Sequence, residues 1–364
     1  MSTNRVAIFF ASPLEAELIE RVRAVSPRLE LFVAPDLWPK LRYVADHTGE
    51  PPVRTPEGEA RWLAMLARAE VCFDFDRSHL ADTVRLAPRL RWIQSTSAGI
   101  IHYMEASGVD KAGITVTTAS GVHAVPLAEW VTFAVLWHEK MGPLIARLKA
   151  DRQWERFCGG EALGRTACVV GYGRVGSEVG RHLEAIGVRV YGVDSLGLVR
   201  KPTASIPADE SVTAVRSTRP VPKDLDIEAV DQALGQILPL SDYLVIATPG
   251  TEDTVRLIDR RRLELMPPSG FVVNIGRGSV IEEQALIEML ASGRLAGAAL
   301  DVFEREPLPA DSPLWAMPNV LINPHSASTS WKENSRITDI FCYNLRRYLA
   351  GEPLVNVYDP LRGY

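Results

Sequence analysis

Three polar side chains follow apolar runs in the last quarter of the chain and could act together on a small acid. Arg277 lies between two glycines, Glu306 precedes a proline and His325 follows one. An arginine can hold a carboxylate through two parallel hydrogen bonds. A histidine can exchange a proton with a carbonyl group near neutral pH, and a neighbouring carboxylate would orient its ring and favour its protonated form. The three residue types together indicate binding of an acid coupled to proton transfer.

Each of these side chains also has an ordinary structural explanation. Arg277 could be a partner in a surface ion pair, Glu306 a solvated loop acid, and His325 a histidine of a helix end or of the core. Their joint occurrence after a nucleotide-binding motif favours the functional interpretation.

That motif is a glycine-rich turn between an apolar strand, expected at residues 167–170, and a helix expected at residues 176–186. In the spacing GxGxxG the first glycine permits a tight turn, the second lets a pyrophosphate approach the backbone, and the third lets helix and strand pack closely. The helix N-terminus offers amides and a positive dipole end to phosphates. A plain turn is the alternative explanation. We predict that a dinucleotide is bound by Gly171, Tyr172, Gly173, Arg174, Val175 and Gly176.

Asp194 follows the next predicted strand, 18 residues after the last glycine of the motif. A carboxylate there can accept hydrogen bonds from the ribose hydroxyls and would repel a 2′-phosphate, which favours NAD over NADP. Arg200 and Lys201 could still compensate a 2′-phosphate. Thr248 and Pro249 are weaker candidates for the same pocket, because they stand at the carboxyl end of a later strand, where ligands of open α/β sheets bind.

The elements that must position these residues form two alternating series of strands and helices, a pattern that predicts parallel sheets covered by helices. In the first series, strands are expected at residues 6–10, 29–33, 71–75 and 90–94, and helices at 16–25 and 59–69. In the second, strands are expected at residues 167–170, 189–193, 243–247, 271–274, 298–300 and 320–322, and a helix at 282–291. A long helix should run from Pro126 to near Gly142. The predicted fold class is α/β with two doubly wound parallel-sheet domains, a Rossmann-type cofactor domain and a flavodoxin-like substrate domain.

The chain of 364 residues is longer than a single core usually supports. An amphipathic segment at residues 331–349 follows the second sheet without an apparent partner there, so we expect it to pack on the first domain. This predicts a discontinuous substrate-binding domain of residues 1–120 and 327–364 and an NAD-binding domain of residues 121–326. The polar, proline-rich residues 198–225 are expected to form a surface excursion, either a tolerated insertion or a functional flap.

Composition excludes several classes of protein. The hydrophobic fraction of 46% and the charged fraction of 23% are those of a globular chain, and the net charge of −5 provides no cationic field for nucleic acid or an anionic membrane. The first apolar run is cut short by Pro13 and is expected to be a strand, not a signal peptide, and no stretch reaches the ~18 apolar residues that span a bilayer. Four scattered cysteines without a CxxC pair argue against a disulfide framework or zinc site. We predict a cytoplasmic protein with reduced thiols and no metal.

From about Thr96 to about Ser328 the sequence resembles the D-isomer-specific 2-hydroxyacid dehydrogenase family. The resemblance is carried by VGYGRVG at residues 170–176, NIGRG at 274–278, ALDVFEREP at 299–307 and NPH at 323–325. It implies hydride transfer between NAD(H) and a small D-2-hydroxy acid or 2-oxoacid, such as glyoxylate or hydroxypyruvate. It also implies a homodimer built on the long helix that follows Pro126.

The resemblance assigns catalytic roles as well. It implies that Arg277 binds and polarises the substrate, that His325 is the acid and base, and that Glu306 pairs with the histidine. Glu306 is preferred to Glu304 because the paired acid of the family directly precedes the proline.

Two further contacts are implied by the same resemblance. Backbone amides of the small-residue loop Ser97, Ala98 and Gly99 should hold the substrate carboxylate, and Asp301 should contact the nicotinamide carboxamide. The first hundred residues are unlike any member of the family that we can place, and the connection at residues 198–225 is longer than usual. The identity of the substrate is therefore not predicted.

Two alternative functions are compatible with much of this pattern. One alternative is oxidation of a substrate such as formate or phosphite on the same scaffold. Formate dehydrogenases resemble the chain but pair the histidine with glutamine, so Glu306 counts against that function. An NAD(H)-binding sensor or corepressor-like module without metabolic turnover could retain the same three side chains, although the sequence has no evident partner-binding motif or long disordered tail.

Overall fold

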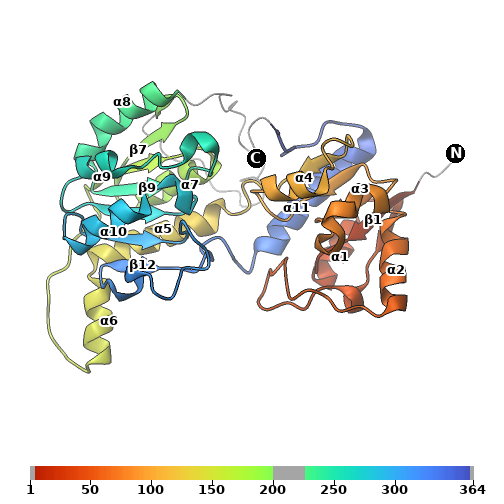
Figure 1. Cartoon of the computed structure of the whole chain (residues 1–364), viewed down its shortest axis with the longest axis horizontal. Coiled ribbons are helices and arrows are strands. Elements are labelled where there is room, and N and C mark those ends of the chain that lie inside the picture. The colour runs from red at the N-terminus through yellow and green to blue at the C-terminus, as the bar shows by residue number, and fades with distance from the viewer. Residues whose placement is uncertain (1–4, 200–225, 361–364) are drawn as a thin grey trace. The chain divides into compact units, whose positions relative to one another are not determined.

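The computed structural model of the chain describes residues 5–199 and 226–360, and these form two compact α/β units (Figure 1). The described residues up to Val122 and from Thr329 onward make up the first unit, and those from His123 to Ser328 make up the second. Most of the predicted polar excursion, with Arg200 and Lys201, lies outside the described residues.

The first unit is built on a parallel sheet in the order β2-β1-β3-β4-β5, which is the flavodoxin-like strand order. The strands are β1 (Val6–Phe10), β2 (Leu29–Phe32), β3 (Val71–Phe73), β4 (Trp92–Gln94) and β5 (Thr115–Thr117). The helices are α1 (Ala16–Arg23), α2 (Pro56–Leu66), α3 (Thr83–Leu86), α4 (Ile101–Ser107) and α11 (Glu333–Ala350).

The C-terminal helix α11 packs on the first sheet. Its apolar stripe, which includes Ile337, Phe341 and Leu345, is buried in one cluster with Phe10 and Phe73 of the strands. Side chains of α1 belong to the same cluster, whereas side chains of α2 and α4 belong to the cluster on the opposite face of the sheet. Helices therefore cover both faces of the sheet.

The second unit is built on a seven-stranded sheet in the order β12-β11-β10-β9-β6-β7-β8. Its strands are β6 (Thr166–Val170), β7 (Arg189–Asp194), β8 (Gly197–Val199), β9 (Tyr243–Ile246), β10 (Phe271–Asn274), β11 (Gly297–Leu300) and β12 (Val320–Ile322). Its helices are α5 (Ala124–Glu139), α6 (Gly142–Ala150), α7 (Arg174–Ala185), α8 (Ile227–Ile237), α9 (Arg260–Leu265) and α10 (Glu283–Ala291). The strand order reverses between β6 and β9, as in a Rossmann fold, so the predicted fold class is confirmed.

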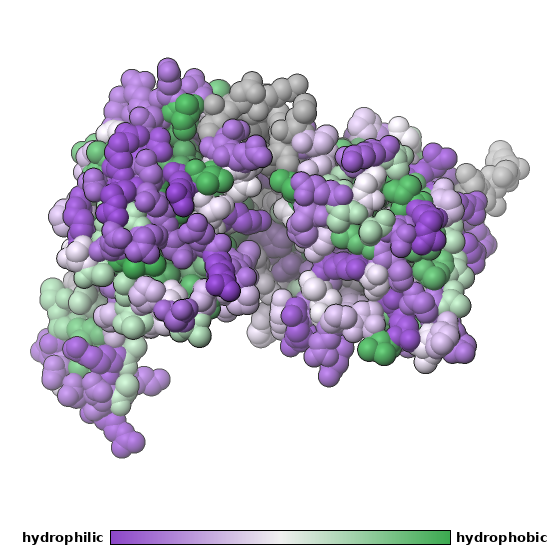
Figure 2. Space-filling view, viewed as in Figure 1, coloured by the Kyte–Doolittle hydropathy of each residue, from purple (hydrophilic) through white to green (hydrophobic). Residues whose placement is uncertain are grey.

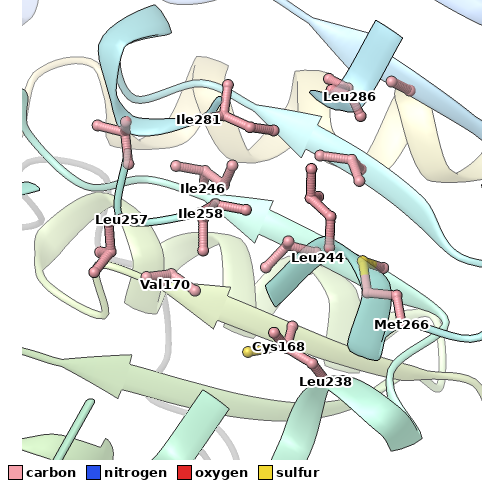
Figure 3. Close-up of a cluster of buried hydrophobic side chains, with 14 of the residues drawn as sticks. Cys168, Val170, Leu238, Leu244, Ile246, Leu257, Ile258, Met266, Ile281 and Leu286 are labelled. Carbon is pink, nitrogen blue, oxygen red and sulfur yellow. The ribbon is translucent and has the colours of Figure 1, made fainter. Parts of the chain in front are cut away.

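Alternate residues of each strand face opposite sides of this sheet, as the pleat requires. On β6, Cys168 and Val170 point into a cluster with Leu286 of α10 (Figure 3), to which Leu234 of α8 also belongs. Val169 points into the cluster formed with α5 and α7. The sheet is therefore buried on both faces, which fixes where each strand ends and where its following loop begins.

Two local predictions were wrong. The long helix expected to continue to near Gly142 ends at Glu139, because Met141 takes a left-handed conformation (φ 58°) and Pro143 then lies in the first turn of a new helix, α6. The excursion expected from Leu198 begins instead with β8, which pairs antiparallel with β7 after a tight turn at Gly197 (φ 93°).

No helix in the described part of the chain combines the length and apolarity needed to cross a bilayer. Cys72, Cys168 and Cys342 are buried and Cys158 is exposed.

Candidate active site

The three glycines of the turn after β6 serve different purposes. A Cβ on Gly171 would lie 2.7 Å from the backbone at Ala247 and Thr248, and its φ of 89° also favours glycine. A Cβ on Gly176 would lie 2.3 Å from the carbonyl oxygen of Gly171. A Cβ on Gly173, in contrast, would meet no atom of the described residues within 4 Å, apart from its own chain neighbours. The outer glycines are thus required by the protein's own packing, and the middle one leaves open space where a pyrophosphate can approach.

The amides available for an anion lie in the first turn of α7. The N–H groups of Gly171 and Tyr172 donate to the carbonyl of Val193, at 2.8 and 3.1 Å, and that of Gly173 donates to Gly171. The N–H groups of the first helical turn, including Val175 and Gly176, have no acceptor inside the helix. They stand next to the open space at Gly173, where the dipole of α7 also favours negative charge.

Tyr172 is directed away from this open space. Its ring lies where a Cβ on Gly192 of β7 would be, and its hydroxyl lies where a Cβ on Gly180 of α7 would be. Because its side chain packs against Gly180 and Gly192 and its amide is used within the turn, Tyr172 shapes the turn.

Two other predicted cofactor contacts flank the glycine turn. Asp194 ends β7, and its Oδ1 accepts a hydrogen bond from the N–H of Leu196 at 2.9 Å. Thr248 follows β9 and is buried, yet its Oγ1 has no hydrogen-bond partner among the described residues. The carbonyl of Pro249 is engaged by the hydroxyl of Thr254 at 2.7 Å. An unsatisfied buried hydroxyl beside an open phosphate site fits a bound ligand.

His325 and Glu306 form a direct pair. His325 Nδ1 lies 2.7 Å from Glu306 Oε2, and Glu306 Oε1 accepts the N–H of Phe303 at 3.0 Å, which holds the carboxylate in place. Glu304 lies apart from the histidine and faces Arg256 at 4.0 Å. With Nδ1 directed to the acid, Nε2 is the ring nitrogen left for proton transfer, and no described residue forms a hydrogen bond with it.

Asp301 organises the loop that carries His325, a role that sequence reasoning missed. Its Oδ1 accepts the N–H groups of Ser326 and Ala327, at 2.8 and 3.0 Å, and the side-chain amide of Asn323 at 2.6 Å. Its carbonyl accepts the N–H of His325 at 2.9 Å. His325 itself has φ of 52°, an uncommon conformation that these contacts maintain. Asp301 Oδ2 has no partner among the described residues and remains able to accept a bond from a ligand amide.

Arg277 is exposed and has no acidic partner in the described part of the chain. Its Nη1 donates to the carbonyl of Gly276 at 2.7 Å. A Cβ on Gly276 would lie 2.5 Å from the carbonyl of Thr248, and a Cβ on Gly278 would lie 1.9 Å from the backbone of Phe303. The flanking glycines thus let the loop after β10 touch the loops on both sides, which brings Arg277 to the edge that also carries Glu306 and His325.

The predicted carboxylate-binding loop lies in the first unit, directly after β4. Thr96 N–H donates to Asp74 Oδ1 at 3.3 Å and Ser97 N–H donates to Ser95 Oγ at 3.1 Å. The N–H groups of Ala98 and Gly99 have no acceptor among the described residues, so this loop offers two adjacent amide donors.

Comparisons with known proteins identify the family of the chain. The family model described as "D-isomer specific 2-hydroxyacid dehydrogenase, NAD binding domain" matches residues 132–217 and 207–327. A glyoxylate reductase of Korarchaeum cryptofilum is 31% identical over 283 residues, which are 75% of this chain and 77% of that protein. A D-3-phosphoglycerate dehydrogenase of Archaeoglobus fulgidus is 29% identical over 301 residues, 82% of this chain but about half (52%) of that longer protein.

Among solved structures, a D-isomer specific 2-hydroxyacid dehydrogenase from Xanthobacter autotrophicus Py2, described as a complex with NADPH and MES, superposes with a TM-score of 0.70. It is 27% identical, and the match covers 98% of this chain and 100% of that one. These relatives favour a dehydrogenase or reductase over a cofactor-binding sensor, and they confirm the resemblance noted in the sequence. The chain carries an NAD(P)-binding domain and belongs to the D-isomer specific 2-hydroxyacid dehydrogenase family of oxidoreductases.

Proposed function

We propose that this enzyme interconverts a small 2-oxoacid, such as glyoxylate or hydroxypyruvate, and the corresponding D-2-hydroxy acid, with NAD(H) as its cofactor. The observation that carries the proposal is the His325–Glu306 pair, 2.7 Å apart, on the sheet edge that also holds Arg277 and the glycine turn. The glyoxylate reductase among its relatives supports the choice of a small substrate.

The residues of the second unit divide the chemistry among them. When bound, the nicotinamide supplies the hydride. Arg277, whose guanidinium has no acidic partner among the described residues, binds the substrate carboxylate and stabilises the charge that develops on the carbonyl oxygen. His325 donates a proton from Nε2 to that oxygen in the reductive direction. Glu306 holds the ring through Nδ1 and stabilises its cationic form.

The cofactor preference is part of the same proposal. Asp194 stands at the end of β7, where a carboxylate disfavours a 2′-phosphate, so we expect NADH to be preferred to NADPH. The NADPH complex of the Xanthobacter relative makes this a point to measure. The ratio of kcat/KM for the two cofactors should favour NADH and should fall at least about tenfold in Asp194→Ala. A wild-type preference for NADPH would contradict the assignment.

We also propose that the enzyme is a cytoplasmic homodimer that uses α5, α6 and the segment after α6. This part of the second unit exposes several large apolar side chains, and Figure 1 shows α6 projecting from the rest of the unit. Phe133, Ile145 and Phe157 are 49%, 43% and 44% exposed, and Trp154 is 97% exposed. In Figure 2 the projecting arm is hydrophilic at its far end and carries hydrophobic side chains nearer the body of the unit.

Light scattering after size exclusion tests the dimer. Trp154→Ser should shift the mass toward that of a monomer, because an aromatic side chain that becomes buried when two subunits associate contributes strongly to their interface. Trp331→Ser is the matched control, since Trp331 is 93% exposed but lies in the first unit. Equal behaviour of the two variants would contradict this choice of surface.

The reaction itself is tested by following NADH and NADPH oxidation with glyoxylate, hydroxypyruvate, pyruvate, 2-oxoisocaproate and phenylpyruvate. His325→Ala should lose roughly 10²- to 10⁴-fold in turnover. His182→Ala is the control, because His182 also pairs with a glutamate, Glu178, at 3.3 Å but lies near the far end of α7. Binding of NADH without turnover of any oxoacid would favour the sensor function instead.

A further inference from the structure

An ion pair that the proposed chemistry does not use lies at the carboxyl ends of β3 and β4, with its acid buried and its arginine partly buried. Asp74 is 0% exposed, and its Oδ2 accepts a hydrogen bond from Arg77 Nη2 at 3.2 Å. Arg77 also donates to the hydroxyl of Thr48, and its guanidinium lies 5.2 Å from the centre of the Tyr103 ring. Because burying two charges removes their hydration, such a pair adds little stability unless it also organises its surroundings.

The pair holds the chain on the N-terminal side of the predicted carboxylate-binding loop. Asp74 Oδ1 accepts the N–H of Thr96 at 3.3 Å, and the N–H of Asp74 donates to the carbonyl of Gln94 at 2.7 Å. Gln94 is the last residue of β4, and Thr96 directly precedes Ser97. A buried carboxylate is a stronger acceptor for the N–H of Thr96 than a neutral group.

The same pair reaches the C-terminal side of that loop. Tyr103, over whose ring Arg77 lies, belongs to α4, the helix that begins at Ile101 directly after Gly99 and Ile100. The segment is therefore held before and after Ala98 and Gly99, whose N–H groups have no acceptor among the described residues. Donors held in place before a ligand arrives bind it without the cost of ordering the loop.

We propose that Asp74 and Arg77 are positioning residues that hold the amides of Ala98 and Gly99 for the substrate carboxylate. The proposal rests on the function proposed above, and neither residue is assigned a contact with substrate. It predicts that loss of the pair weakens binding of the 2-oxoacid far more than it slows the bound substrate's reaction.

Asp74→Asn is the informative variant, because Asp74 has φ of 68° and asparagine tolerates that conformation while removing the charge. Asp76→Asn is the matched control. Asp76 is 4% exposed and lies two residues further on, but it accepts from Trp62 Nε1 and pairs with His79, at 3.0 and 2.8 Å, and has no contact with the loop.

In steady-state kinetics with the best oxoacid of the panel, Asp74→Asn should raise KM by about 10- to 100-fold, the range expected when a binding group is displaced by up to about 1 Å. kcat should change by less than about threefold, and the dissociation constant for NADH should stay at the wild-type value. Arg77→Met should act in the same direction, and the double variant should be little worse than either single one, because the two residues act as a unit. Asp76→Asn should keep the wild-type KM.

Amide hydrogen exchange of residues 94–100 provides a readout that needs no turnover. Exchange should be faster in Asp74→Asn and Arg77→Met than in the wild type or Asp76→Asn. Equal KM values and equal exchange in Asp74→Asn and Asp76→Asn would overturn the positioning role. A wild-type protein that turns over no oxoacid would overturn the proposed function instead, and the exchange comparison would still decide whether the pair holds the loop.

Discussion

Replacing Gly173 by alanine tests whether this glycine is needed for the stability of the turn or for binding of the cofactor. A methyl group there would meet no atom of the described part of the chain within 4 Å, apart from its own neighbours, and the residue has a negative φ of −84°. The change brings no clash with the described residues, but the ψ of −146° lies outside the regions that alanine prefers, so we expect no gain in stability and a loss of about 1 kcal/mol. Gly176→Ala is the control: its Cβ would lie 2.3 Å from the carbonyl oxygen of Gly171, against a usual minimum of 3.0 Å. To reach that minimum separation, the Cβ and the carbonyl oxygen must move apart by about 0.7 Å, at a cost of about 1–3 kcal/mol.

Cofactor binding should respond differently. The methyl group of Gly173→Ala would occupy the space into which the pyrophosphate must fit, so the dissociation constant for NADH should rise at least about tenfold, or about 1.4 kcal/mol. Thermal unfolding without cofactor measures the first effect, and titration of NADH fluorescence measures the second. Wild-type NADH affinity in Gly173→Ala would refute the placement of the pyrophosphate. A large loss of stability in the same variant would refute the geometry of the turn.

Three further changes test the site and the fold. Glu306→Gln should lower kcat by about 10- to 100-fold with little change in the KM of the oxoacid, because a charge-assisted bond to His325 is worth about 1.5–3 kcal/mol; unchanged kcat in steady-state assays would contradict this. Asp301→Asn should lower both kcat and the melting temperature, since three donors of the histidine loop lose a charged acceptor. The hydrogen bond from His182 lowers the pKa of Glu178 from its ordinary 4.5 to about 2, so the carboxylate stabilises the fold above pH 4.5 and loses this effect as the pH falls toward 2. Between pH 6 and pH 3 the wild type should therefore lose on the order of 2 kcal/mol more than Glu178→Gln in denaturant titrations.

Strands buried on both faces were the elements that the sequence predicted best. The ranges expected for β1 and β10 coincide with those in the structure, and β6 differs by one residue; the range of β12, a partly exposed edge strand, also coincides. Such strands are continuous apolar runs, and a parallel α/β fold needs them in that form. Arg277 and His325 follow two of these strands, so the candidate site could be located without knowledge of the fold.

Elements that depend on tertiary partners were missed. β5 is a three-residue strand with threonine at both ends, and its Thr117 hydroxyl is buried between the side chains of Trp92 and Gln94. β8 is equally short and runs antiparallel, and its turn depends on Gly197, where a Cβ would lie 2.7 Å from the carbonyl of Ala229. Each strand is too short to show an apolar pattern of its own, and each depends on a residue distant in sequence, Trp92 for β5 and Ala229 for β8.

The side chains proposed to act on the substrate could also be identified from the local sequence, whereas those that position them could not. Arg277 could be identified as a candidate because it lies between two glycines. The structure gives another reason for those glycines, which is the close approach of their backbone to Thr248 and Phe303. Asp301 holds Ala327, 26 residues away, and Asp74 holds Thr96, 22 residues away. No spacing rule within a single sequence pairs such residues, because the contact exists only once parallel strands bring their carboxyl ends together. The positioning groups of this enzyme therefore have to be identified from the folded chain and tested against neighbours of equal burial.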